Sequence, residues 1–360
     1  MKIGILTFHN AYNFGAILQA YALQTFLEDK GHQVDILDYR NEEVELSYKL
    51  FCFEKMPIYN PLRCVAYWAI QLFRYSKYRQ FKKEVYRLLN ISSQIIDVND
   101  TILAEKDIIV VGSDQLWNRK ITGTFDPMYW GDFSKQINGK VITYAVCMNT
   151  DSLTSGDFQF IKRHLENFTS LSVRENDLAD ILKPLASNKI NVSLDPTLMV
   201  EGDIWYRLIK NTKTPFKEPY VLVYAILERK KVIDNAKKFA ASKGMRLVIM
   251  SPIADVNPFK EHYMPTSPIE FISSIANAEY VITSSFHGLA FSTIFHREVY
   301  VMGDKGKNAR MRSLLRNIGL EDRFVLSVER EYNKIDYIRV DEKLNKLRSE
   351  SQQYLQNAIK

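Results

Sequence analysis

The feature that most limits the fold of this chain is a repeated alternation of short apolar runs with longer helical patterns. Residues 3–8 form an apolar run, residues 16–30 carry apolar side chains at helical spacing, and residues 34–37 form a second apolar run. Parallel strands joined through a helix by a right-handed crossover produce this pattern. Further apolar runs of strand length lie at 107–111, 141–146 and 171–173. We therefore predict an α/β fold with a parallel sheet.

The same alternation begins again after a polar segment at 212–219. Apolar runs of strand length in this second half lie at 220–224, 247–250, 280–283 and 299–302. A chain of 360 residues is long enough for two domains that each bury a core. We expect two Rossmann-like α/β domains with parallel sheets that face each other across a cleft. The predicted parts are an N-terminal domain at 1–211, a linker at 212–219, a C-terminal domain at 220–335 and a solvated C-terminal helix at 336–360.

Composition and charge narrow the class of protein. The chain is 46% apolar and 25% charged, and it has no apolar stretch of the ~18 residues that a membrane span requires. Its first ten residues lack the apolar length of a secretory signal, so we expect a cytoplasmic protein. The formal net charge of +6 is small and is spread along the chain rather than gathered in one long block. It argues against nucleic-acid binding and fits an acidic small substrate or an anionic membrane surface.

Cysteine spacing gives no sign of a disulfide framework or a zinc site. The three cysteines, Cys52, Cys64 and Cys147, form no pair or Cys/His pattern of the kind that such sites require. The six histidines also show no mutual spacing for a metal site. We therefore expect no bound metal and no cofactor.

One segment, residues 62–89, interleaves aromatic and basic side chains. A helix of this composition could lie on a membrane, at its inner face, or receive a lipid-linked substrate. The alternative is an ordinary helix that covers the N-terminal core, and the sequence favours this alternative.

Four strand-to-loop junctions carry the polar residues that point to a ligand site. Open α/β sheets bind ligands beyond the carboxyl ends of their strands, where the N–H groups of helix starts hold anions. The candidate residues at these junctions are Asn13, Gly15 and Gln19 in the first, Ser113, Asp114, Gln115 and Trp117 in the second, Arg174 in the third, and Ser284, Ser285, His287 and Gly288 in the fourth.

The first two junctions have ordinary structural explanations as well as functional ones. Asn13 and Gly15 could turn the chain toward a ligand, but Asn and Gly are also the commonest turn residues. Trp117 could stack on a sugar beside polar groups, or it could be a core side chain.

The other two junctions offer charge and a proton donor. Arg174 could pair with Glu175 or Asp177, or its guanidinium could bind a carboxylate or phosphate. His287 could donate a proton near neutral pH, although core histidines are common. Arg310 and Arg312 follow the last apolar run of the second half and could close over an anion or remain solvated. No common dinucleotide, nucleotide, serine-hydrolase or zinc-protease motif occurs in the chain.

Taken together, these junctions resemble those of the polysaccharide pyruvyl transferase family. The segments that carry the resemblance are NFGAILQAYALQ (13–24), GSDQLWN (112–118), SVRE (172–175), DPTL (195–198), SSFHGLAFS (284–292) and RMRSLLRNIGLEDR (310–323). The resemblance implies transfer of the enolpyruvyl-derived group of phosphoenolpyruvate to two hydroxyls of a sugar, which forms a pyruvate ketal. It also implies a fold like that of GT-B glycosyltransferases and no obligate metal.

These expectations assign a role to each candidate residue. His287 is the candidate acid. The residues assigned to the donor are Arg174, Ser284, Ser285, Gly288, Arg310 and Arg312. The residues assigned to the sugar acceptor are Asn13, Gly15, Gln19, Ser113, Asp114, Gln115 and Trp117. Many members of the family have arginine at the place of Ser285, so another cation must supply the charge or the donor is bound differently. A nucleotide-sugar glycosyltransferase and a non-catalytic glycan-binding or assembly protein are the alternatives.

Overall fold

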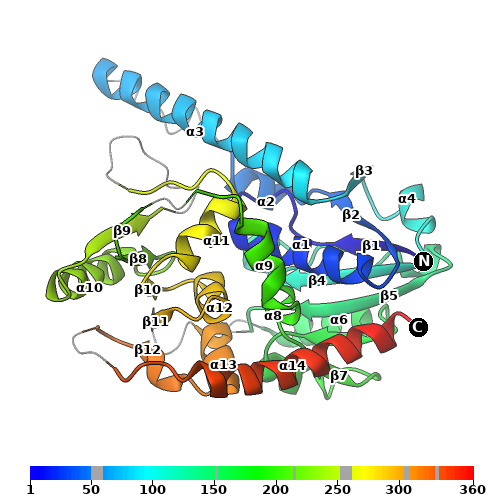
Figure 1. Ribbon diagram of the computed structural model, residues 1–360. Coiled ribbons are helices and arrows are strands. Elements are labelled where there is room, and N and C mark those ends of the chain that lie inside the picture. The colour runs from blue at the N-terminus through cyan, green and yellow to red at the C-terminus, as the bar shows by residue number, and fades with distance from the viewer. Residues whose placement is uncertain (50–59, 151–152, 214–215, 252–261, 304–307, 329–331) are drawn as a thin grey trace.

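The chain folds around two separate parallel sheets, as the alternation of apolar runs predicts. The computed structural model describes residues 1–49, 60–150, 153–213, 216–251, 262–303, 308–328 and 332–360. The first sheet has seven strands in the order β3-β2-β1-β4-β5-β6-β7, and the second has five in the order β12-β11-β10-β8-β9. Figure 1 shows the two sheets side by side, with helices between and around them. The predicted fold class, α/β with two parallel sheets, is confirmed.

The elements of the first sheet and its helices run from the N-terminus to residue 209. They are β1 (Lys2–Leu6), α1 (Phe14–Glu28), β2 (Gln33–Tyr39), α2 (Glu42–Ser47), α3 (Pro61–Leu88), β3 (Ile91–Ile95), α4 (Thr101–Ala104), β4 (Ile108–Asp114), α5 (Arg119–Thr122), β5 (Lys140–Val146), α6 (Ser155–Leu165), β6 (Leu171–Val173), α7 (Asn176–Leu182), β7 (Ile190–Val192), α8 (Pro196–Met199) and α9 (Gly202–Ile209). β4 includes the Gly-Ser-Asp sequence that the apolar pattern places in a loop after the strand.

The second sheet and its helices occupy the remainder of the chain. They are β8 (Tyr220–Tyr224), α10 (Arg229–Ser242), β9 (Arg246–Met250), α11 (Pro268–Ala276), β10 (Tyr280–Thr283), α12 (Phe286–Ile294), β11 (Glu298–Met302), α13 (Ala309–Ile318), β12 (Phe324–Val325) and α14 (Tyr337–Ala358).

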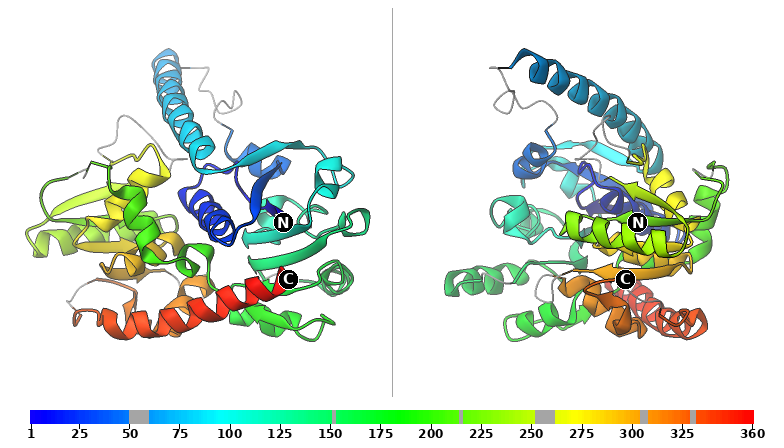
Figure 2. Two further views of the ribbon diagram at one scale, coloured as in Figure 1. Left: turned by 45° about the vertical axis from the view of Figure 1, so that its right-hand side comes forward. Right: turned by 90° about the vertical axis from the view of Figure 1, so that its left-hand side faces the viewer.

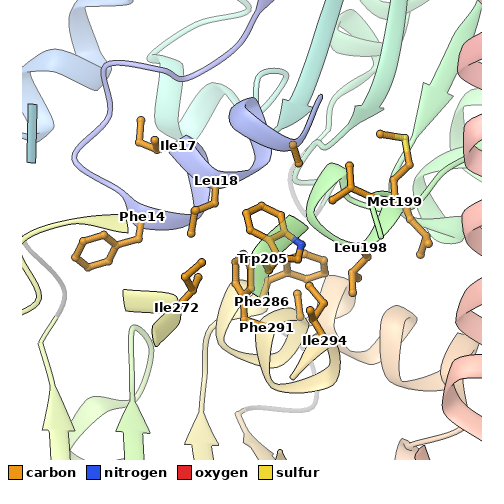
Figure 3. Packing of buried hydrophobic residues seen from close by; sticks show 14 of the residues in the cluster. Phe14, Ile17, Leu18, Leu198, Met199, Trp205, Ile272, Phe286, Phe291 and Ile294 are labelled. Atoms are coloured by element: carbon orange, nitrogen blue, oxygen red, sulfur yellow. The ribbon is translucent and has the colours of Figure 1, made fainter. Parts of the chain in front are cut away.

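A shared hydrophobic core joins the two halves on one side of the molecule. Phe14 of α1 stacks on Phe271 of α11 with ring centroids 4.9 Å apart, and Trp205 of α9 meets the Phe291 ring of α12 edge-on at 5.0 Å. Figure 3 shows Trp205 and Phe291 from close by, with Leu198 of α8 beside Trp205. All these side chains belong to one buried cluster that takes residues from both sheets. The halves are therefore in direct apolar contact over part of their interface.

The C-terminal helix α14 is not the solvated helix that its composition predicts. One face, which includes Val340, Leu344 and Leu355, is buried. The Ser351 hydroxyl accepts a hydrogen bond of 2.9 Å from the backbone N–H of Leu194, far back in the chain. The expectation is wrong because the apolar residues of α14, although few, recur at helical spacing and pack on both α8 and α13. Figure 1 shows α14 lying across both halves of the molecule.

The basic and aromatic segment forms the long helix α3. Its last turns are packed through Phe81, Val85 and Leu88, and Gln71 is buried nearer the middle of the helix. The first turns project from the body of the molecule, as both views in Figure 2 show. α3 thus covers the N-terminal core over a fraction of its length.

Among the helices of the described segments, none is both long enough and apolar enough to cross a membrane.

Candidate functional site

A cavity of about 310 Å³ lies where the carboxyl ends of strands from both sheets meet. Its N-terminal wall comes from residues after β4, β5 and β6, and its C-terminal wall from the start of α12 and the start of α13. Ligands of α/β proteins bind at such strand ends, and the volume suits a small molecule. The predicted site residues that line this cavity are Gln115, Ser284, Ser285 and Arg310.

His287 lies in the first turn of α12, beside the cavity and facing the N-terminal half. Its side chain is about one-tenth exposed, and its Nε2 atom lies 3.7 Å from Oδ2 of Asp195. Gly15, near the start of α1, packs against the other side of the ring. A Cβ atom at position 15 would lie 1.9 Å from Nδ1 of His287. The imidazole is therefore held between α1 and Asp195, and its Nε2 atom is buried.

Asp195 also forms the central ion pair of the site. Nη2 of Arg174 lies 2.7 Å from its Oδ2 atom, and both side chains are almost fully buried. Oδ1 of Asp195 accepts hydrogen bonds from the backbone N–H and hydroxyl of Thr197, at 2.9 and 2.6 Å. Burial alone would raise the pKa of Asp195, but Arg174 and His287 together hold it well below its usual range. A permanent negative charge thus lies between a guanidinium and an imidazole.

Arg174 has donors that the protein does not use. Nη2 hydrogen-bonds the hydroxyl of Ser113, and the guanidinium lies over the Phe286 ring, 4.9 Å from its centroid. Its Nε and Nη1 atoms are buried and have no protein partner in the described part of the chain. Arg174 also lines a small hollow that it shares with Phe286 and Arg310. The first partner of Arg174 is therefore Asp195, twenty-one residues later, rather than Glu175 or Asp177.

Glu175 is a buried carboxyl on the wall of the cavity. Its Oε2 atom has no hydrogen-bond partner among the described residues. Burial raises the pKa of Glu175, against the opposing effect of Arg174 and Arg310. Neighbouring Cys147, on the same wall, is buried too, and burial raises the pKa of its thiol well above the ordinary value.

Arg310 and Asp114 face each other across the two halves. Nη1 of Arg310 lies 3.9 Å from Oδ1 of Asp114, and the arginine side chain is about one-third exposed. Arg312 is directed elsewhere, because its guanidinium lies over the Phe324 ring at 5.5 Å. Of these two arginines assigned to the donor, only Arg310 lines the cavity. The assignment of Arg312 to the donor is therefore wrong.

Trp117 belongs to the core of the N-terminal half. Its ring is fully buried and stacks on Trp130 with centroids 4.3 Å apart. Its indole N–H donates a 2.8 Å hydrogen bond to the carbonyl of Tyr129. The prediction that Trp117 stacks on a sugar is wrong, because its ring is fully buried in the core.

Three other residues assigned to the acceptor hold the backbone of the site instead of lining the cavity. The Asn13 side chain caps α1 by accepting a 2.9 Å hydrogen bond from the N–H of Gly15. Gln19 is fully buried, donates to the Thr7 hydroxyl at 2.8 Å and accepts from the N–H of Ser113. Ser113 donates its hydroxyl to the carbonyl of Ala145 at 2.9 Å. These contacts hold the start of α1, where Gly15 lies, and the end of β4, where Asp114 lies.

The serines before His287 shape the start of α12. The Ser284 hydroxyl accepts from the N–H groups of Ile226 and Leu227, both at 3.0 Å, and so ties two loops together. Ser285 caps the helix by accepting from the N–H of Gly288 at 3.4 Å. A Cβ atom on Gly288 would lie 2.3 Å from the Thr283 hydroxyl, so glycine allows α12 to pack on β10.

Sequence reasoning assigns no role to Asp195 or Glu175. Both lie within three residues of the carboxyl end of a strand, as most other candidates do. That position was the feature of the sequence that could have identified them. In the parts of the chain that the structure describes, no three His, Cys, Asp or Glu side chains are grouped so as to hold a metal ion.

This chain is similar to known proteins both in family and in fold. The family model for polysaccharide pyruvyl transferase matches residues 13–305, and no curated protein matches the chain. Two similar solved structures are UDP-GlcNAc 2-epimerases. The enzyme from Rickettsia bellii has a TM-score of 0.51 at 10% identity, covering 99% of this chain and 95% of its own. The enzyme from Neisseria meningitidis, bound to UDP-GlcNAc, has a TM-score of 0.50 at 12% identity, covering 99% and 94%.

At these identities the solved structures show a shared fold alone. The family match covers most of the chain, from the cap of α1 to the loop before α13, and includes every strand end that forms the cavity. The chain belongs to the polysaccharide pyruvyl transferase family.

Proposed function

We propose that this protein transfers the enolpyruvyl-derived group of phosphoenolpyruvate to two hydroxyls of a sugar, forming a cyclic pyruvate ketal in capsular or exopolysaccharide synthesis. The observation that supports this most is the buried line of Arg174, Asp195 and His287, which lies beside the cavity that Arg310 lines. The acceptor is a sugar linked to a lipid or a nucleotide, and the reaction takes place in the cytoplasm. It needs no metal or cofactor, since the donor itself carries the leaving phosphate.

Charge at the site suits a donor with both a carboxylate and a phosphate. Arg174 offers two buried N–H-bearing nitrogens with no protein partner among the described residues, and Arg310 reaches the cavity from the other half. The backbone N–H groups at the start of α12 add partial positive charge beside Ser285. Two arginines and a helix start compensate for the serine at the place where many family members have arginine.

In the proposed reaction, His287 gives a proton to the methylene carbon of phosphoenolpyruvate, which creates a cationic centre at carbon 2. A sugar hydroxyl adds to this carbon and loses its proton. Phosphate then leaves, and the second hydroxyl adds to the same carbon and loses its proton, closing the ring. One of the two hydroxyl protons replaces the proton given by His287, and the other leaves with phosphate. The products are the ketal and inorganic phosphate.

Asp195 acts in this scheme as a positioning residue. Its carboxylate, 3.7 Å from Nε2, orients the imidazole. Arg174 and Thr197 keep the carboxylate in place from the other side. A carboxylate already held by three partners does not itself take up the proton.

The test is phosphate release from phosphoenolpyruvate with a galactose-type acceptor, combined with detection of the ketal by mass. We expect release by the native protein and a loss of about a hundredfold or more in kcat for His287→Ala, the usual scale for a general acid. His32→Ala, which changes a histidine at the loop after α1, is the matched control and keeps the native rate.

Two results would contradict the proposal. One is an absence of phosphate release while a nucleotide sugar is consumed, which would indicate a glycosyltransferase. The other is a full native function with His287→Ala, which would indicate a glycan-binding or assembly protein.

A further inference from the structure

The net charge of this protein is concentrated on α3. The helix has seven Lys and Arg residues and one Glu, which gives it a formal charge of +6. The whole chain has 48 basic and 42 acidic residues, so everything outside α3 contains 41 of each and is neutral. The expectation that positive charge is spread along the chain is therefore wrong. One projecting helix supplies the entire excess.

One side of α3 forms a continuous exposed stripe along the helix. Its members recur every three or four residues, which places them on one face. They are Leu62, Val65, Trp68, Leu72, Tyr75, Arg79, Lys83 and Tyr86. Leu62 is 83% exposed, Val65 is 69% exposed and Leu72 is 61% exposed. Isolated exposed apolar residues are ordinary, but a row of them on a helix that leaves the body of the protein indicates a contact surface.

Apolar and basic parts of the stripe succeed one another along the helix. The N-terminal half carries Leu62, Val65 and Leu72, and the C-terminal half carries Arg79 and Lys83. Lys82 extends over the Tyr78 ring, 5.0 Å from its centroid, so the flanks also combine base and aromatic groups. Exposed apolar side chains beside long basic ones are typical of helices that lie in the interface of an anionic bilayer.

We propose that α3 is a docking element that lays this protein on an anionic lipid surface. The apolar half of the stripe enters the boundary between headgroups and acyl chains, and the basic half binds the negative headgroups. An acidic protein partner would explain the charge but not the row of exposed aliphatic side chains. A second copy of this chain would bring +6 against +6.

The packed end of α3 is connected to the active site. Tyr12 lies between Tyr78 and Phe81 of α3, with ring centroids 4.8 and 4.6 Å apart. Tyr12 belongs to the loop that leads into Asn13 and Gly15, and Gly15 touches His287. A docked α3 would therefore hold the membrane surface at a fixed position relative to the cavity. The docking itself does not depend on the proposed reaction.

The experiment is sedimentation of the full-length protein with vesicles of phosphatidylcholine, with and without phosphatidylserine. We expect binding to the anionic vesicles only, and weaker binding as salt increases. The double variant Arg79→Glu/Lys83→Glu should lower the vesicle partition coefficient by at least about tenfold. The triple variant Leu62→Ser/Val65→Ser/Leu72→Ser should lower it as well, since both kinds of contact are required.

A matched control makes the same change of charge on a different surface of the protein, the exposed side of α10. Lys237→Glu/Lys238→Glu alters two exposed lysines of α10 by the same amount and should leave vesicle binding within about twofold of the native value. Every substituted side chain is exposed, so we expect all variants to fold. Thermal unfolding checks this.

Three outcomes would overturn the proposal. The first is an absence of binding to anionic vesicles at low salt, and the second is binding that survives both α3 variants. The third is a concentration-dependent dimer, or a complex with duplex DNA, that the α3 variants abolish while vesicle binding stays unchanged.

Discussion

Three residues carry the proposed chemistry at the candidate site, and each depends on its neighbours. The His287 ring fits against α1 only because position 15 is glycine, and it has a charged partner only because Asp195 lies opposite. Asp195 in turn remains ionised because Arg174 offsets the cost of burial. The three come from α12, the loop after β7 and the end of β6.

Substitution of Gly15 by alanine should damage catalysis more than stability. The new Cβ atom would lie 1.9 Å from Nδ1 of His287, so the imidazole must move away from Asp195. We expect kcat to fall by about a hundredfold, the scale of a lost general acid. Gly156→Ala is the control, since its Cβ atom meets nothing closer than 3.9 Å in α6 and should leave the rate unchanged. Equal rates for native protein and Gly15→Ala would contradict the assignment of His287.

Glu175 should make the protein less stable as pH rises. Burial raises the pKa of Glu175, so the folded state holds the proton more tightly than the unfolded state. The stability that this proton contributes is present below the ordinary pKa of glutamate and is lost as pH rises through the higher folded value. Urea unfolding of Glu175→Gln should show a stability gain over the native protein that increases between pH 4 and pH 7. Glu279→Gln, at an exposed position, should show no such trend. A constant difference for Glu175→Gln would refute the argument.

Helix starts bring the functional groups together at the scale of single elements. α1, α7, α12 and α13 all begin near the cavity, because each follows or faces a parallel strand end. In α13, helical spacing directs two nearby side chains to different surroundings. Arg310 and Arg312 are two residues apart and therefore point to nearly opposite sides of the helix. One reaches the cavity and the other lies over Phe324.

This geometry separates the two arginines functionally. Arg310→Gln removes a charged donor from the cavity and should raise the KM for phosphoenolpyruvate by about ten- to a hundredfold, the range for hydrogen bonds to charged groups. Arg312→Gln removes the same charge from the opposite side of α13 and should change the KM by less than about threefold. Steady-state kinetics with saturating acceptor makes the comparison. If both variants raised the KM equally, charge alone and not position would be responsible.

At the scale of the whole molecule, α14 connects the two halves. Arg348 donates a 3.1 Å hydrogen bond to the carbonyl of Leu198, and the Tyr354 hydroxyl donates to the carbonyl of Thr143 at 2.8 Å. The start of the same helix packs near β11, where the Tyr337 hydroxyl donates to the carbonyl of Arg297. Together with the aromatic core around Phe14 and Trp205, these contacts fix the distance across the cavity.

Removing a buried side chain from α14 should therefore weaken both halves. Leu355 is fully buried, and Leu355→Ala should lower the free energy of unfolding by about 2–5 kcal/mol. Ile338, on the same helix, is 76% exposed, and Ile338→Ala should change it by less than about 0.5 kcal/mol. Hydrogen exchange should become faster in α8 and α13 together for Leu355→Ala. Faster exchange in only one of them would show that α14 does not couple the halves.

The sequence by itself determined the class of the fold and the positions at which a site could form. Alternating apolar runs and helical patterns specify parallel sheets locally, and the carboxyl ends of those strands are where polar residues gather. His287, Arg174 and Arg310 could be found in this way, because each stands at such a junction.

Only the tertiary structure decided where each candidate lies relative to the cavity. Trp117 is buried, Arg312 points away, and Asp195 joins Arg174 to His287. The sequence also did not reveal the buried face of α14, because most residues of this helix are polar. The physical reason is that these contacts join residues far apart in the chain, so their energies depend on how the two halves pack and not on any local pattern.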